Sequence, residues 1–192
     1  MGAFRTLFFL LLVAPAVAGC DTPVEGRNFP EIGFSHQAPI ALNVASIEVK
    51  KPPPGAVEGS VLSELPVTPA EVAERWARER LKPVGTSGTA VVTIEKASLI
   101  EERLRKTGGV RGAFTTDQTE RYVGELALAV SIVEPGGEAS AKARATRTRT
   151  IPEGATLAER EKLWFDIVES LGRNIDKVME EQIEKHMTAY LR

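Results

Sequence analysis

Few residues in this chain have the types and spacing that catalysis or metal binding requires. The two histidines, His36 and His186, lie far apart, and neither is beside a nucleophile or a second metal ligand. Gly108-Gly109 lacks the lysine and the strand–helix context of a phosphate-binding loop. The carboxylates fall in runs of mixed charge, such as residues 159–162, which are typical of a solvated helix face. We therefore expect a protein that is not an enzyme and that has no metal and no cofactor.

The single cysteine, Cys20, follows a segment with the features of an export signal. Arg5 precedes an apolar run at residues 7–13, and small residues dominate positions 14–19. This order is typical of a secretory signal peptide, and the apolar run is shorter than the roughly 20 residues that a membrane span needs. Two interpretations follow. Either an ordinary signal peptide is removed and Cys20 remains as a free thiol, or Cys20 is the attachment point of a lipid.

The residues Val17-Ala18-Gly19-Cys20 resemble the lipobox of bacterial lipoproteins. The resemblance implies cleavage before Cys20, acylation of this residue with chains such as palmitate, and anchorage in the bacterial cell envelope, facing the periplasm. Two or three acyl chains hold a protein far more firmly than one. Asp21 resembles the inner-membrane retention signal of enterobacteria, a rule that varies between bacterial groups. We favour the outer membrane and keep the inner membrane as the alternative.

Proline and glycine recur between Asp21 and Pro39 without any apolar period, which predicts a linker. Its 19 residues would span at most about 65 Å when fully extended. We therefore expect a signal peptide at residues 1–19, a lipidated N-terminus and flexible linker at residues 20–39, and a single domain at residues 40–192.

Alternating apolar residues predict four strands in this domain. The first covers residues 40–50 with a bulge near Ala45, and the second covers residues 90–104 with a bulge or sharp twist. A polar, glycine-containing loop at residues 106–118 precedes the third strand, at residues 122–132. The fourth strand follows a Pro-Gly-Gly turn, and one of its faces is nearly all alanine. A bulky element must therefore pack closely against that face.

Two capping boxes predict two helices. Thr68 and Glu71 open a helix that ends after Lys82, and Thr156 and Glu159 open a helix whose apolar period continues to the end of the chain. The order β-α-β-β-β-α predicts an α+β fold, a four-stranded, mainly antiparallel sheet with two helices on one face.

Basic residues gather on the third and fourth strands and form the candidate binding site for an anionic ligand or a partner. They are Arg121, Lys142, Arg144, Arg147 and Arg149. By alternation, Lys142 and Arg144 share one face and Arg147 and Arg149 the other. Arginine binds phosphate well because its planar guanidinium can contact two oxygens at once. The alternative is that these cations pair with nearby carboxylates and keep the sheet soluble. The carboxylates in question are Glu95, Glu101, Glu120 and Glu125.

The lipobox, the linker and the β-α-β-β-β-α order together resemble the LPS-assembly lipoprotein family (LptE). The local likeness lies in Glu120-Arg121-Tyr122, the Pro-Gly turn, the arginine-rich strand at residues 144–149 and the closing helix. The chain departs from that family at Asp21-Thr22-Pro23, where a glycine and an aromatic residue are usual. It is also similar to auxiliary lipoproteins of ABC-type lipid transporters. A third likeness is to uncharacterised proteobacterial lipoproteins, through residues 39–42 and 114–118.

These resemblances imply an accessory lipoprotein of an envelope assembly or of a lipid or LPS transport complex. Its partners would be the membrane, through the N-terminal lipid, and an envelope protein. Binding of anionic lipid or glycan is the alternative function. The net charge of −2 shows no global bias toward nucleic acid, so we expect no nucleic-acid partner.

Overall fold

The computed structural model describes residues 29–51, 57–103, 118–134, 137–152 and 154–192. The main sheet contains β2 (Ser46–Lys50), β4 (Thr89–Arg103), β5 (Gln118–Glu134) and β6 (Gly137–Pro152), in the order β2-β4-β5-β6. β2 is parallel to β4, and the other two pairings are antiparallel. The predicted four-stranded, mainly antiparallel sheet is confirmed. Leu104 and most of the predicted loop at 106–118 lie outside the described residues, and Gln118 belongs to β5.

The out-of-phase apolar residues of β4 are explained by a bulge. The register with β5 shifts between Ile94 and Lys96, so Val92 and Ile94 share the buried face with Leu99. An extra residue in one strand of an antiparallel pair reverses the face on which later side chains lie. The predicted irregularity in this strand is therefore confirmed.

The single strand predicted at residues 40–50 is wrong, because the chain divides there between two sheets. β1 (Ile40–Leu42) pairs in parallel with β3 (Leu81–Pro83), and only β2 joins the main sheet. The chain turns between the two strands, where the backbone N–H of Val44 donates to the carbonyl of Leu42 at 2.8 Å, and Gly85 permits the close approach there because a Cβ on it would lie 2.6 Å from the carbonyl carbon of Asn43. The expected bulge near Ala45 is thus the passage from one sheet to the other.

Both predicted helices are present and begin at their capping boxes. α1 (Pro69–Arg80) follows Thr68, and α2 (Leu157–His186) follows Thr156. α1 ends two residues before the predicted position because Leu81 begins β3. α2 does not continue to the chain end, since the short 3-10 helix η2 (Thr188–Tyr190) follows it. A second 3-10 turn, η1 (Leu62–Glu64), precedes α1.

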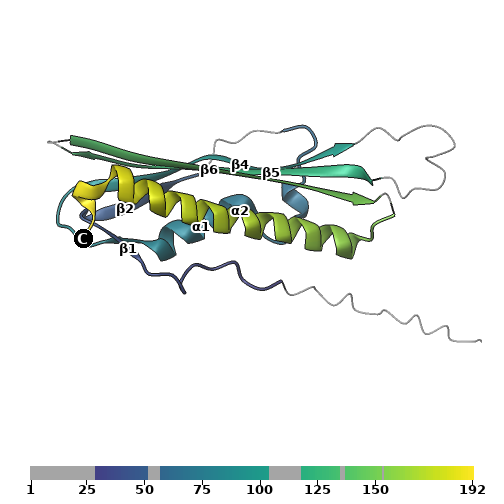
Figure 1. Ribbon diagram of the computed structural model, residues 1–192, viewed down its shortest axis with the longest axis horizontal. Coiled ribbons are helices and arrows are strands. Elements are labelled where there is room, and N and C mark those ends of the chain that lie inside the picture. Colours follow the sequence, from purple (N-terminus) through teal and green to yellow (C-terminus); the bar gives the residue numbers. More distant parts are fainter. Residues whose placement is uncertain (1–28, 52–56, 104–117, 135–136, 153) are drawn as a thin grey trace, which may run out of the picture.

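The two helices cover the same face of the main sheet, as predicted, and no helix of the described residues lies on the opposite face (Figure 1). α2 lies along β5 and β6, where Ala141, Ala143 and Ala145 are buried. Gly124 on β5 faces the same helix, and a Cβ there would lie 2.7 Å from Cγ2 of Ile167. α2 is the bulky element that the alanine-lined face predicted.

The last eleven residues of the predicted linker, 29–39, belong to the domain, and we name them the strap. Ile32 and Phe34 of the strap are buried, with 7% and 3% of their surfaces exposed. The strap runs along the helical layer on the side away from the sheet (Figure 1). Gly172 of α2 permits this contact, because a Cβ there would lie 2.8 Å from Val72 and 3.3 Å from Phe34. The expected domain start at Ile40 is therefore corrected to Phe29 or earlier, and residues 20–28 lie outside the described residues.

A methyl group at Gly124 tests how closely α2 approaches the sheet. The Gly124→Ala variant should lose about 1–3 kcal/mol of unfolding free energy, because the new Cβ would overlap two buried side chains. Urea unfolding measures this loss. Gly154→Ala is the control, since no atom lies within 4 Å of a Cβ there. Equal stability of the two variants would contradict the close approach.

Candidate functional site

The five candidate basic residues lie on two faces of the sheet. On β6, Lys142 and Arg144 are exposed and alternate with the buried alanines, so they lie on the face without helices. Arg121 of β5 lies on this face too, since its neighbour Tyr122 is buried on the other. Arg147 and Arg149 have the parity of the alanines and lie on the helix-covered face near the end of β6. The alternation predicted for these two pairs is confirmed, and no single five-residue cluster exists.

Carboxylates on β4 and β5 pair with the three cations of the helix-free face. Lys142 lies 3.0 Å from Glu95, Arg144 lies 3.0 Å from Glu125, and Arg121 lies 2.5 Å from Glu102. Exposed pairs of this kind contribute between nothing and about 1 kcal/mol each to stability. Their main effect is to lower the net positive charge of this face.

Arg147 and Arg149 differ from the other three cations. Neither has an ion pair with any residue in the described part of the chain. Arg147 is half-buried and Arg149 is exposed. In the ladder they stand opposite Gly124 and Tyr122. The unneutralised positive charge of β6 is therefore concentrated at its C-terminal half, beside the start of α2.

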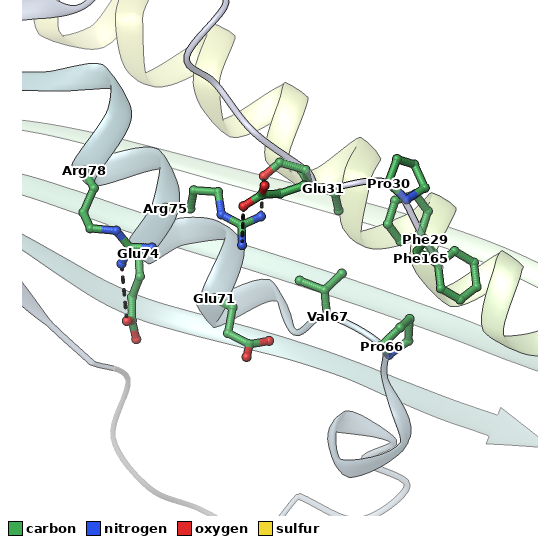
Figure 2. A pocket seen from close by; sticks show the side chains of 11 residues that line it. Phe29, Pro30, Glu31, Pro66, Val67, Glu71, Glu74, Arg75, Arg78 and Phe165 are labelled. Carbon is green, nitrogen blue, oxygen red and sulfur yellow. Dashed lines mark hydrogen bonds and ion pairs between the residues drawn. The ribbon is translucent and has the colours of Figure 1, made fainter. Parts of the chain in front are cut away.

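A pocket of about 390 Å³ lies where the strap crosses the start of α1 (Figure 2). Phe29 of the strap stacks on Phe165 of α2, with ring centroids 4.9 Å apart, and Val67 lies nearby on the opposite wall. Arg75 of α1 donates a hydrogen bond of 2.9 Å to the carbonyl of Ile32. The pocket thus has apolar side chains on one part of its wall and charged side chains of the strap and α1 on the rest.

The charged side chains at the rim of this pocket contact one another. Arg75 pairs with Glu31 at 3.1 Å, and Glu74 lies 3.1 Å from Lys51 and 4.0 Å from Arg78. The Arg75 interactions fasten the strap to α1, and all of these charged groups have partners within the protein. The arrangement suits a structural seam better than a site that orients a small polar ligand.

A second groove, of about 700 Å³, lies on the other side of the strap, against α2. His36 and Asp176 are among its lining residues, together with Glu169, Arg173, Lys177 and Glu180. His36 is exposed, and so is His186 at the end of α2. Within the described residues, no cluster of three or more histidine, cysteine, aspartate or glutamate side chains is arranged to bind a metal ion.

A buried ion pair joins the two helices beneath this groove. The Arg80 guanidinium of α1 is fully buried, and its Nε donates to Oδ1 of Asp176 at 2.6 Å. The indole of Trp76 donates to the same oxygen at 3.0 Å, and Glu180 lies 2.9 Å from Nη2 of Arg80. Burial alone would lower the pKa of Arg80, but the two carboxylates outweigh this effect and raise it.

Sequence reasoning missed this ion pair, although a signal was present. Asp176 interrupts the apolar stripe of α2 between Gly172 and Met179, where a solvated charge is not expected. A charged residue in a buried stripe indicates an opposite charge on the facing element. The partner itself could not be identified, because several arginines of α1 have compatible positions.

A second cluster of polar side chains surrounds the Tyr122 hydroxyl, where β5 meets the start of α2. This hydroxyl donates to Glu120 at 3.0 Å, and Arg160 of α2 contacts both Glu120 and the hydroxyl. The Tyr122 ring packs edge-to-face on Trp164. Burial first, and then the negative charge of Glu101, raise the pKa of Tyr122 to about 12. At neutral pH the phenol therefore remains protonated and acts as a hydrogen-bond donor.

Four carboxylates were named in the sequence as alternative partners for the basic residues, and among the described residues Glu95 and Glu125 pair with two of the five candidate cations. Glu95 pairs with Lys142 and Glu125 pairs with Arg144. Glu120 instead contacts Arg160, and Glu101 accepts a hydrogen bond from Tyr122 at 3.4 Å. Cys20, the predicted lipidation site, lies outside the described residues.

Removal of the Asp176 carboxylate should strongly destabilise the protein. Asp176→Ala leaves the buried Arg80 without its nearest charge, and breaking such a pair typically costs about 3–5 kcal/mol. The unfolding free energy measures this loss. The double variant Arg80→Leu/Asp176→Leu is the control and should recover most of it, because neither charge then remains buried. A single variant as stable as the wild type would contradict a structural role for the pair.

Alkaline pH should weaken the fold through Tyr122. An unfolded tyrosine ionises near pH 10, whereas folded Tyr122 ionises at about 12. Its contribution to stability is therefore complete below pH 10 and is lost as the pH rises toward 12. Phenolate absorbance of a Tyr190→Phe variant, in which Tyr122 is the one remaining tyrosine, measures the folded pKa. Ionisation near pH 10 would contradict the buried hydroxyl.

Comparison with known proteins adds no family to this description. No protein-family model matches the chain, and no curated protein matches it significantly.

Proposed function

We propose that this protein is a membrane-anchored envelope lipoprotein that faces the periplasm and is an accessory component of an envelope assembly or of a lipid or LPS transport complex. It acts by binding rather than by catalysis. One observation carries the proposal: the helices of the described residues cover one face of the main sheet and leave the other without a helix (Figure 1). Within the same residues, no strand pairs with the outer edge of the long strand β6. The lipobox-like sequence before Cys20 supports the membrane anchor.

The helix-free face has the character of a docking surface for a polar partner. Its strands carry small or short side chains, with Thr93, Ala129 and Ser131 in the middle and threonines toward the end of β6. Ion pairs between strands lie among them, one from β6 to β5 and one that reaches across β5 from β6 to β4. Antiparallel sheets commonly leave one face to solvent. A flat face of this kind is soluble without a partner and still offers a wide contact area.

Binding of an anionic lipid or glycan is the second candidate function. The unpaired charges of Arg147 and Arg149 favour it, since guanidinium groups bind phosphate and carboxylate oxygens. The ion pairs of Arg121, Lys142 and Arg144 favour the accessory role, because these cations are already neutralised. We therefore place the accessory function first.

In the described part of the chain, no helix is both long and apolar enough to cross a bilayer. Membrane attachment in this proposal depends on Cys20. A Cys20→Ser variant should lose labelling by radioactive palmitate and move from the membrane fraction to the soluble fraction. Asp21→Ser is the matched control and should keep the label, and a shift between inner and outer membrane fractions would identify the role of Asp21. Unchanged palmitate labelling of Cys20→Ser would contradict the anchor.

The accessory role is tested in the same cells. Wild-type protein with a C-terminal affinity tag is crosslinked in intact cells, purified and analysed by mass spectrometry. One envelope protein recovered in near-equal amount supports the proposal and shows which membrane is involved. Recovery of lipid alone would contradict it and favour the second candidate.

A further inference from the structure

The two edges of the main sheet differ in how far other segments of the chain pair with them. On one side β2 pairs with residues 89–93 of β4, and residues 59–61 pair with residues 99–101. The backbone N–H of Glu101 donates to the carbonyl of Gly59 at 2.8 Å, and the backbone N–H of Val61 donates to the carbonyl of Leu99 at 3.1 Å. Gly59 permits this approach with a φ of +73° and a Cβ position only 2.6 Å from the Glu101 carbonyl oxygen. The chain thus covers two stretches of this edge itself.

The other edge is open along sixteen residues. β6 pairs with β5 from Gly137 to Pro152, and none of the described strands pairs with its outer side. α2 packs on one face of β6. β6 has no proline before Pro152, so each earlier residue can donate a backbone hydrogen bond. Every second residue therefore directs its N–H and C=O groups away from the sheet.

Charge selects what can pair with this edge. β6 contains four cations and one anion, Glu138, and Arg147 and Arg149 are the two cations without an ion pair in the described part of the chain. Between and beside these arginines lie Thr146, Thr148 and Thr150, on the opposite face. A second copy of β6 would bring two cationic strands side by side, and like charges on neighbouring strands repel. An added strand with carboxylates on the arginine face would be attracted.

We propose that the open edge of β6 at residues 145–150 is a docking site for an extended acidic segment of a protein partner, which adds a strand to the main sheet. Backbone hydrogen bonds supply the pairing, and the side-chain period of two supplies the selection. Acidic residues at every second position of the partner lie beside Arg147 and Arg149, and polar residues between them lie beside the threonines. The same arginines that exclude self-pairing thus select an oppositely charged strand.

This inference deepens the proposed accessory function by naming the chemistry of its partner. Its test is independent of the membrane anchor, because peptide binding is measured with the full chain in detergent. If the peptide does not bind, the lipidation and crosslinking results still test the accessory proposal. If the lipidation or crosslinking experiment fails, the peptide result still tests the docking site on β6.

The probe is a synthetic peptide of about nine residues in which glutamate and threonine alternate, a length within the usual range of strands. We expect it to bind, and to slow hydrogen exchange at backbone amides within residues 145–150 while residues 59–61 are unaffected. Arg147→Glu/Arg149→Glu should weaken binding by about tenfold, because two attractions become repulsions. Lys82→Glu/Lys177→Glu is the matched control, with the same change of charge at exposed positions outside β6, and should change binding less than about twofold.

Four results would overturn the proposal. The first is absence of peptide binding, and the second is equal binding of a peptide with lysine in place of glutamate. The third is self-association of the chain through residues 145–150, which would assign the edge to a second copy. The fourth is binding of anionic phospholipid vesicles, lost in Arg147→Glu/Arg149→Glu, without any peptide binding. That result would assign the arginines to lipid head groups.

Discussion

The close approach of α2 to the main sheet is the constraint on which the other features depend. A helix of 30 residues is about 45 Å long, which nearly matches the length of β5 and β6. It lies close to them because the sheet offers alanines and Gly124 where larger side chains would collide. The same contact leaves large side chains of β4 and β5 for α1 to cover. It also keeps both helices on one face, so that the other face and the edge of β6 remain accessible.

The periphery of the domain is held by short segments from distant parts of the sequence. The strap packs over the seam between α1 and α2, above the buried pair of Arg80 and Asp176. The C-terminal residues pair with the segment at β1. The backbone N–H of Asn43 donates to the carbonyl of Tyr190, and the backbone N–H of Arg192 donates to the carbonyl of Ala41. These contacts close the helical layer and the small sheet. β6 has no comparable cover among the described residues, which sets it apart from the rest of the molecule.

Local patterns predicted the features that depend on local physics. Both capping boxes, the bulge in β4 and the alternation of faces along β6 follow from neighbouring residues alone. The division of residues 40–50 between two sheets depends on Gly85, and the docking of the strap depends on Gly172. Neither contact leaves a trace in the local pattern, because its two sides are far apart in sequence. The sequence therefore predicted which basic residues belong to the candidate site. It did not predict which of these cations have an ion pair and which do not.

Docking of the strap sets the distance at which the domain can work. With lipid on Cys20, as we propose, the chain reaches the domain at Phe29, so at most about 30 Å separates the bilayer surface from the folded part. A free linker that continued to Ile40 would have allowed about twice that distance between the bilayer surface and the domain. Phe29 stacks on Phe165, next to Trp164 and Tyr122, and Tyr122 stands opposite Arg149 in the ladder. In that proposal, the arginine-bearing end of β6 lies at the same end of the domain as the attachment of the tether.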